Sequence, residues 1–291
     1  MALIGTLTTG VSALTTFSKA LDVIGNNIAN VNTTGYKGSS ASFAESFSNT
    51  LRSSSPSNGT QSSQAGIQVG TGVQLDGIAT NFSQGALNST GNSTDLGLAG
   101  NGFFIVKDAT GGQTFATRDG QFRIDDNGYL VTQAGMRVQG LVGGSSSTPL
   151  GTTVGDIQVG QNVPSGTSLQ SISIDTGGNV VEFYSDGTSA TTNRVELQNF
   201  SDTSALMRQG GNLYSGLTAA GPAGGGILAG SNDPGTSGLA NIQSGTLEQS
   251  NVDLTQQFSD LITAQRSFQA GSRLITVSDT VLEDVVNLKT R

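Results

Sequence analysis

The 291-residue chain contains no cysteine, no histidine and no tryptophan. Without cysteine and histidine, disulfides, thiolate nucleophiles, imidazole-based catalysis and the usual zinc sites are excluded. Aromatic residues make up 5% and charged residues 12% of the sequence, whereas glycine alone contributes 42 residues. This composition predicts thin β layers joined by glycine-rich turns rather than a single thick core.

Positive charge and long apolar runs are also scarce. The chain has 13 basic and 21 acidic residues, so its net charge of −8 argues against a nucleic-acid partner. No stretch approaches the roughly 20 apolar residues of a spanning helix, so we expect no membrane insertion. The first positive charge is Lys19, and the basic region of a cleaved signal peptide is missing. We therefore expect a cytoplasmic protein, or one that is exported without cleavage of a leader.

Apolar residues recur at seven-residue intervals at both ends of the chain. The N-terminal series is Leu7, Leu14, Leu21 and Ile28, with Ile24 between the last two. The C-terminal series is Leu254, Leu261, Phe268, Ile275 and Leu282, with Phe258 in the alternate position. Sustained heptads predict two helices that pack lengthwise as a coiled coil, rather than two separate amphipathic helices. Asn251 or Asp253 is the predicted N-cap of the second helix.

Four asparagines lie in the last part of the N-terminal apolar stripe: Asn26, Asn27, Asn30 and Asn32. Their side-chain amides compete for nearby backbone groups, so asparagine is a poor helix former. Either the helix ends here, or the amides bind a neighbouring subunit, since they donate and accept hydrogen bonds without charge repulsion.

The middle of the chain has a β pattern. The run from Gly102 to Asp108 is a strand candidate, and the dipeptides Asp119–Gly120 and Asn127–Gly128 predict hairpin turns that join successive strands. A second β stretch runs from Ser168 to Phe200, and 53–63 has the polar composition of a linker. The sequence thus predicts an α+β chain with an antiparallel, hairpin-built body. Its predicted parts are an N-terminal helix (1–36), an extended linker (37–72), the β-rich body (73–245) and a C-terminal helix (246–291) that pairs with the first.

Candidate chemical sites are weak. Asp125, Asp126, Asn127 and Gly128 are similar to part of a calcium loop, but no glutamate stands at the closing position. The carboxylates of Glu182 and Asp186 are a conceivable pair for glycoside chemistry, although carboxylates on a β surface are ordinarily solvated. We expect no metal, no cofactor and no enzymatic activity. A wall-acting enzyme or an exported accessory protein that does not polymerise are the alternatives.

Three blocks of sequence resemble the flagellar rod and hook family. LDVIGNNIANVNTTGYK (21–37) is similar to its N-terminal signature. LGLAGNGFFIV (96–106) leads into TRDGQFRIDDNGYLVT (117–132), which is similar to the family's central segment. GTLEQSNVDLTQQFSDLITAQRSFQ (245–269) resembles the start of its C-terminal block, which runs on to 288. Because these blocks lie at both ends and in the middle, the resemblance covers the chain.

The resemblance implies an axial subunit of the bacterial flagellum, passed unfolded through the flagellar type III export apparatus. Such subunits build helical homo-oligomers of roughly eleven protofilaments, in which a helical coiled-coil core domain lines the channel. The implied partners are other rod subunits, the hook cap and the proteins of the hook–filament junction. The implied location is the extracellular hook or the basal body region.

Within the family, the C-terminal block favours a hook protein, with a distal rod protein as the close alternative. Residues 140–166 are then a candidate remnant of the outer domain that larger hook proteins carry. The stretch from Phe43 to Gly72 points the other way, because a comparable stretch follows the first helix in distal rod proteins. We expect 53–63 to act as a hinge or spacer. The predicted subunit-assembly residues are Leu7, Leu14, Leu21, Ile24, Asn26, Asn27, Ile28, Asn30, Leu254, Phe258, Leu261, Gln265, Arg266, Phe268, Ile275 and Leu282.

Overall fold

The computed structural model describes residues 2–56, 63–144, 153–161, 163, 166–228 and 232–289. They form two compact units. The helical unit comprises Met1–Ala29, Gly38–Asn81 and Val252–Arg291, and the β unit comprises Asn30–Lys37 and Phe82–Asn251. The predicted α+β class, with two terminal helices and an antiparallel β body, is confirmed. Much of the predicted hinge at 53–63 and of the predicted remnant at 140–166 lies outside the described residues.

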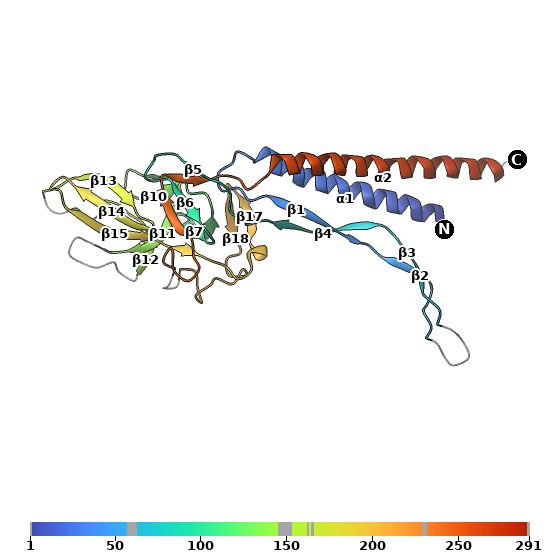
Figure 1. Ribbon diagram of the computed structural model, residues 1–291, viewed down its shortest axis with the longest axis horizontal. Coiled ribbons are helices and arrows are strands. Elements are labelled where there is room, and N and C mark those ends of the chain that lie inside the picture. The colour runs from blue at the N-terminus through green and yellow to red at the C-terminus, as the bar shows by residue number, and fades with distance from the viewer. Residues whose placement is uncertain are drawn as a thin grey trace. The chain divides into compact units, whose positions relative to one another are not determined.

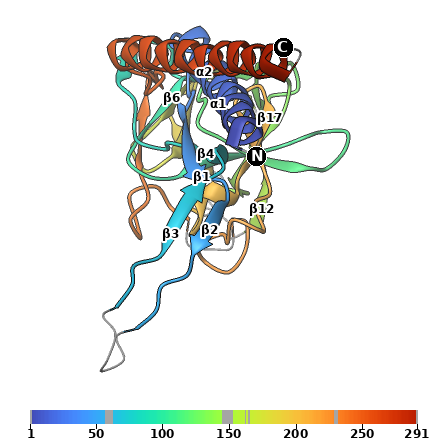
Figure 2. The ribbon, with the colours of Figure 1, turned by 90° about the vertical axis from the view of Figure 1, so that its right-hand side faces the viewer.

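Two helices, α1 (Ala2–Ala29) and α2 (Leu254–Lys289), lie side by side and antiparallel in the helical unit (Figures 1 and 2). The Thr6 and Ser278 hydroxyl oxygens are 3.1 Å apart at one end of the pair, and Asn27 binds Gln257 near the other. Of the two predicted caps, Asp253 begins α2, since its carboxylate accepts the Thr255 N–H at 2.8 Å. No helix within the described ranges is long and apolar enough to cross a membrane.

The first helix ends at Ala29 rather than at residue 36. The following turn is closed by the side chain and the carbonyl of Asn30, which accept the hydroxyl and the backbone N–H of Thr33 at 3.2 and 3.1 Å. Gly35 then takes a φ of +66°, a left-handed conformation that no helix tolerates. The asparagine-rich segment is therefore the place where the helix terminates, as one of the two predictions had it.

The segment predicted as an extended linker, 37–72, contains strands. An antiparallel ribbon pairs β1 (Ser39–Glu45) with β4 (Val73–Thr80) and β2 (Ser48–Arg52) with β3 (Ile67–Gly70), as Figure 2 shows. The composition misled because a two-stranded ribbon buries little side-chain surface, and every residue of β2 and β3 is exposed. Hydroxyls of α1 hold the return strand: Ser12 accepts the Val73 N–H, and Thr16 donates to the Val73 carbonyl, both at 3.3 Å.

The β unit is built on an antiparallel sheet whose main strand order is β13-β14-β15-β11-β7-β8-β18-β17. Two short pairs, β5–β20 and β6–β19, bring residues 241–248 beside residues 87–99. The strands are β5 (Leu87–Ser89), β6 (Leu96–Ala99), β7 (Phe103–Lys107), β8 (Thr114–Thr117), β9 (Phe122–Ile124), β10 (Leu130–Thr132), β11 (Arg137–Val142), β12 (Thr153–Asp156), β13 (Leu169–Ile174), β14 (Asn179–Tyr184), β15 (Ser189–Val195), β16 (Leu197–Gln198), β17 (Met207–Gly210), β18 (Leu213–Ser215), β19 (Asn241–Ser244) and β20 (Thr246–Glu248). One 3-10 turn, Thr203–Ala205, follows β16.

Strand β7 divides two hydrophobic clusters. Phe104 and Val106 face a cluster with Leu96, Leu197 and Ile242. Phe103 and Ile105 face the other, which is rich in aromatic rings. This alternation arises because successive side chains of a strand point to opposite faces, and it explains why the run from 103 to 106 is wholly buried.

The two predicted hairpin dipeptides have different roles. Asn127–Gly128 forms the predicted turn between the paired strands β9 and β10, with Gly128 at φ +81°. The prediction for Asp119–Gly120 is wrong, because β8 pairs with β7 and β18 and not with β9. Gly120 instead allows the backbone to pass close to Leu96, because a Cβ at this position would lie 1.7 Å from the Leu96 carbonyl oxygen.

Candidate functional site

The apolar residues of α1 among the predicted assembly residues face the inside of the helical unit. Leu7, Leu14, Leu21, Ile24 and Ile28 are all partly buried. Leu14 lies against Gly271 of α2, because a Cβ built on that glycine would be 3.5 Å from a Leu14 methyl group. These side chains therefore contribute to the helix pair within one chain, and a contact with another chain is not needed to explain them.

The helix pair uses the predicted heptad of α2 in part and adds a second one. Ile275 of the predicted heptad lies against Gly10 of α1, since a Cβ built on that glycine would be 2.9 Å from an Ile275 side-chain carbon. The buried or half-buried positions Gln257, Ala264, Gly271 and Ser278 are seven residues apart and carry small or polar side chains. Leu261, Ile275 and Leu282 are partly buried beside this seam. Large side chains are not needed there, since small residues let two helices approach closely.

The other predicted residues of α2 lie on exposed surface. Leu254, Phe258 and Phe268 are 39%, 51% and 37% exposed, and Gln265 and Arg266 are exposed as well. These three side chains therefore leave much of their surface outside the helix pair, unlike Ile275, which lies against Gly10 of α1. Their exposure leaves a role in subunit assembly as a proposal.

The asparagines near the end of α1 have separate environments. Asn27 is 2% exposed and binds within its own chain: its amide donates to the Ser39 carbonyl at 2.7 Å and to Gln257 at 2.9 Å. Its carbonyl accepts the Ser39 N–H at 2.9 Å, so this amide joins α1, β1 and α2. Asn26 is exposed, and Asn30 closes the turn after the helix.

The segment 33–37 lies inside the β unit. The Thr34 hydroxyl donates to the Asp119 carboxylate at 3.1 Å, and the Thr34 carbonyl accepts from Asn212 at 2.7 Å. At Gly35 the backbones touch, because a Cβ there would lie 2.6 Å from the Asp119 nitrogen. The Arg208 guanidinium lies over the Tyr36 ring at 4.9 Å and donates to the Lys37 carbonyl.

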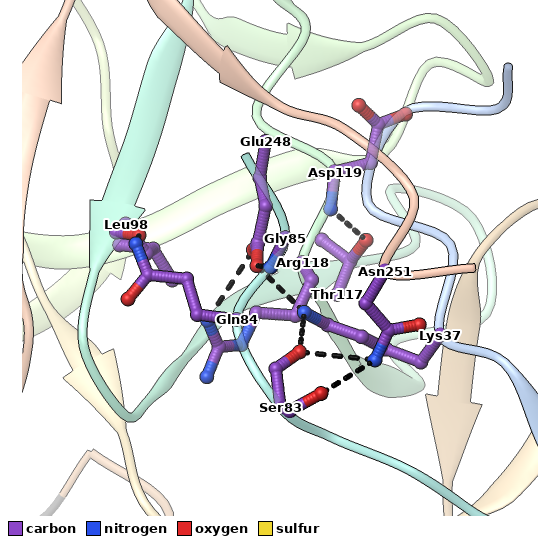
Figure 3. Close-up of polar contacts among 10 residues, drawn as sticks. All are labelled: Lys37, Ser83, Gln84, Gly85, Leu98, Thr117, Arg118, Asp119, Glu248 and Asn251. Carbon is purple, nitrogen blue, oxygen red and sulfur yellow. Dashed lines mark hydrogen bonds and ion pairs between the residues drawn. The ribbon is translucent and has the colours of Figure 1, made fainter. Parts of the chain in front are cut away.

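A buried ion cluster joins all three sequence blocks (Figure 3). The Lys37 ammonium lies 2.6 Å from one carboxylate oxygen of Glu248, and Arg118 donates to the other at 3.3 Å. Lys37 also donates to the Ser83 carbonyl at 2.8 Å, and the Gly85 N–H donates to Glu248 at 2.8 Å. The side chains of Lys37 and Glu248 are inaccessible to solvent, and that of Arg118 is 2% exposed.

Burial dominates the electrostatics of this cluster. It lowers the pKa of Lys37 below its usual value, and the hydrogen bond and charge of Glu248 oppose that shift. Burial likewise lowers the pKa of Arg118. The nearby Asp119 has a raised pKa for the same reason, because burial disfavours its charged form. The cluster ties three distant segments of the chain together. It contains two cationic side chains and one carboxylate, so positive charge is in excess.

Sequence reasoning missed this cluster. In the sequence, Lys37, Arg118 and Glu248 belong to three separate motifs, and no pattern connects them. Since charged residues are rare in this chain, the one usable signal was that each block carries a charge next to small or apolar residues. Nothing in one sequence shows that residues 37, 118 and 248 meet.

The candidate enzymatic carboxylates have structural roles. Glu182, expected to be solvated, is fully buried and accepts hydrogen bonds from the Gly160 N–H, the Thr192 hydroxyl and the Tyr184 hydroxyl at 2.8–2.9 Å. Burial and this carboxylate raise the pKa of Tyr184 to about 12. Asp186 is exposed and closes a turn by accepting from the N–H and hydroxyl of Thr188. In the calcium-like segment, Asp125 closes the hairpin turn by accepting from Gly128 and Asp126.

Comparison with known proteins finds the same three blocks. Family models match residues 7–37 ("Flagella basal body rod protein"), 97–182 ("Flagellar hook protein FlgE/F/G D1 domain") and 243–288 ("Flagellar basal body rod FlgEFG protein C-terminal"). The flagellar basal-body rod protein FlgG of Bacillus subtilis (strain 168) is 37% identical over 97% of this chain and 98% of its own length. This chain belongs to the flagellar rod and hook family.

Two hook relatives differ in how much of this chain they match and in how similar they are to it. The flagellar hook protein FlgE of Helicobacter mustelae is 47% identical, but over 46% of this chain and 30% of its own length. The hook protein FlgE of Borreliella burgdorferi is 25% identical over 97% of this chain and 99% of its own length, in an alignment of 445 positions.

The ion cluster joins one residue from each of the three regions that the family models match.

Proposed function

We propose that this protein is a subunit of the distal rod of the flagellar basal body, which polymerises into a stiff, torque-transmitting tube. The length of the match carries this proposal. The Bacillus rod relative aligns with 283 residues, nearly the whole of both chains, whereas a full-length hook alignment has to extend over 445 positions. A hook protein of that size contains material for which this chain has no counterpart.

The ribbon of β1–β4 supports the same reading. Its strands β2 and β3 lie in the stretch from Phe43 to Gly72, whose length resembles distal rod proteins. The hook prediction remains the alternative, supported by the higher local identity to the Helicobacter hook protein and by the C-terminal block.

The way in which the chain enters and leaves the β unit supports a torque-transmitting role. The chain leaves it toward α1 through 30–37 and toward α2 through 249–251. These two connections are tied together, since Gly35 donates to the Glu248 carbonyl at 2.8 Å and Lys37 pairs with the Glu248 carboxylate. A load that enters through either helix therefore reaches the same buried cluster.

The exposed flank of α2 is the proposed assembly surface. Leu254, Phe258 and Ile262 follow one another at four-residue intervals, a spacing that keeps them on adjoining turns of one side of the helix. A repeated contact of this flank with a different surface of the next copy is heterologous, and such contacts build helical tubes rather than closed rings. The export apparatus, hook cap and junction proteins are partners that the family resemblance implies.

Imaging of basal bodies from cells that lack the protein tests this proposal. For a distal rod subunit, we expect a rod that stops short of the outer membrane or cell surface, with assembly restored by the complementing gene. A complete rod without a hook would replace the proposal with the hook alternative. A complete rod with a hook of normal length would exclude both functions.

A further inference from the structure

The β unit contains a pocket of about 450 Å³ whose lining includes no residue of the proposed assembly surface on α2. The rings of Phe82, Phe103 and Phe200 wall it, and the exposed residues Ser83 and Ser201 lie at its rim. The ring centroids of Phe82 and Phe200 lie 5.4 and 5.6 Å from that of Phe103, so the walls form one packed aromatic surface. Arg118 is the charged residue among those that line it.

Arg118 is incompletely paired. Its hydrogen bond to Glu248 uses one terminal nitrogen at 3.3 Å, and its guanidinium carbon lies 5.1 Å from the Phe103 ring centroid. Its Nε is buried and has no acceptor among the described residues. Figure 3 draws the other terminal nitrogen of Arg118 without a contact to the residues of the cluster. The edge formed by Nε and that nitrogen is the edge with which arginine binds a carboxylate through two parallel hydrogen bonds.

The cluster has one more positive charge than negative charge, which favours the binding of an anion. Lys37 and Arg118 share the single carboxylate of Glu248, so one positive charge has no partner within the cluster. A buried cation without a partner is costly, and a carboxylate that enters from the pocket would neutralise it. An aromatic or other apolar group behind that carboxylate would fit the phenylalanine walls, where ring contacts add to the apolar burial.

We propose that this pocket is a binding site for a carboxylate carried on an aromatic or apolar group. The carboxylate binds the free edge of Arg118, and the apolar group packs on Phe82, Phe103 and Phe200. A free organic acid and an acidic side chain of another copy offer the same chemistry, and this acidic chain has 21 carboxylate side chains.

Phenylacetate is a suitable probe for the full-length chain at a concentration where it is monomeric. In nitrogen-detected NMR of the arginine Nε–H groups, we expect a saturable shift of the Arg118 signal. Phenethylamine, which has a similar shape and the opposite charge, should not produce it. Arg118→Lys keeps the charge and removes the fork, so the affinity for phenylacetate should fall at least about tenfold; isothermal titration calorimetry measures it for the parent and the variant, because the variant has no Arg118 signal. Arg123→Lys, an exposed arginine of the same unit, should leave binding unchanged.

A second variant keeps the test decisive if Arg118→Lys does not fold. Ser201→Phe places a ring at the rim and should abolish phenylacetate binding, whereas Ser171→Phe on the exposed part of β13 should not. No saturable shift, equal binding of phenethylamine, or undiminished binding by Ser201→Phe would overturn the proposal. Repeating the titration where copies associate separates the two sources. Loss of phenylacetate binding on association would identify an acidic side chain of another copy as the occupant of the pocket. Retained binding would identify a free organic acid as the occupant.

Discussion

The ammonium of Lys37 and the carboxylate of Glu248 lie 2.6 Å apart, although 211 positions separate them in the chain. Both side chains are fully buried, and they lie next to the two connections that lead to the terminal helices. The flagellar signature at the start of the chain and the one near its end therefore meet physically. Their spatial pairing gives a reason for both motifs besides any contact between subunits.

Breaking this pair should be costly, and the cost should depend on the partner removed. Glu248→Gln leaves two buried cations without a carboxylate, whereas Lys37→Met leaves Glu248 paired with Arg118. Loss of one partner of a buried pair typically costs about 3–5 kcal/mol. We expect Glu248→Gln to lower the free energy of unfolding by an amount at or above that range. Lys37→Met should lower it by less. Urea unfolding of the full chain, with exposed Arg123→Gln as control, measures both, and a larger effect of Lys37→Met would contradict the asymmetry.

Gly35 should be sensitive to a methyl group for two separable reasons. It has a φ of +66°, and its backbone touches Asp119. Gly112 also has a φ of +66° but faces open space, so Gly112→Ala isolates the conformational cost, about 1–2 kcal/mol. Gly35→Ala should lower the free energy of unfolding by clearly more than this. Equal effects of the two substitutions in urea unfolding would show that the Asp119 contact relaxes freely.

Glu196 should make stability depend on pH. Both of its carboxylate oxygens are buried and lack a hydrogen-bond partner among the described residues. Burial raises its pKa from 4.5 to about 7, while nearby Arg194 opposes and Asp233 adds to this shift. Because the folded state binds this proton more tightly, the stabilisation is complete below pH 4.5 and is lost as the pH rises to about 7.

Glu196→Gln removes this titration. Relative to the parent chain, the variant should gain on the order of 3 kcal/mol of stability between pH 4.5 and neutrality. Urea unfolding across that pH range measures the difference. Parallel pH profiles of the parent and the variant would show that Glu196 does not titrate there.

The seam between the helices should accept one methyl group and reject a larger side chain. A Cβ on Gly271 would make ordinary contacts with Leu14 and Ala13 at 3.5–3.6 Å. Gly271→Ala should therefore stabilise the helix pair by up to about 1 kcal/mol through helix propensity. Gly25→Ala, which faces open space, should show the propensity effect alone. Gly271→Leu should separate the helices, and an unchanged melting temperature by circular dichroism would disagree with this seam.

The exposed flank of α2 should matter for assembly and little for the isolated chain. Phe258 is 51% exposed, so Phe258→Ser should change the free energy of unfolding by less than about 1 kcal/mol. The same change should prevent polymers from forming, as seen by electron microscopy or by loss of complementation. Phe183→Ser, a similarly exposed phenylalanine of the β unit, is the matched control. Normal polymers of the Phe258 variant would remove this flank from the proposed assembly surface.

The sequence by itself determined the elements whose signals are local. The heptads at both ends predicted two long helices, the apolar run at 103–106 predicted a buried strand, and Asn127–Gly128 predicted a hairpin turn. Periodicity and turn chemistry act between residues close in the chain, so one sequence is enough to read them. The three motifs also identified the family without any structure.

Tertiary structure decided which of these residues meet. The seam with α1 includes the heptad of Ala264 and Gly271, because close helix approach favours small side chains. Of the heptad of large side chains, Ile275 lies against Gly10 of α1, whereas Phe268 is 37% exposed. Strands formed within the predicted linker 37–72 because backbone pairing between 39–52 and 67–80 needs few apolar residues. The cluster of Lys37, Arg118 and Glu248 depends on strand pairings that bring distant segments together, and a buried charge leaves no local pattern that reveals its partner.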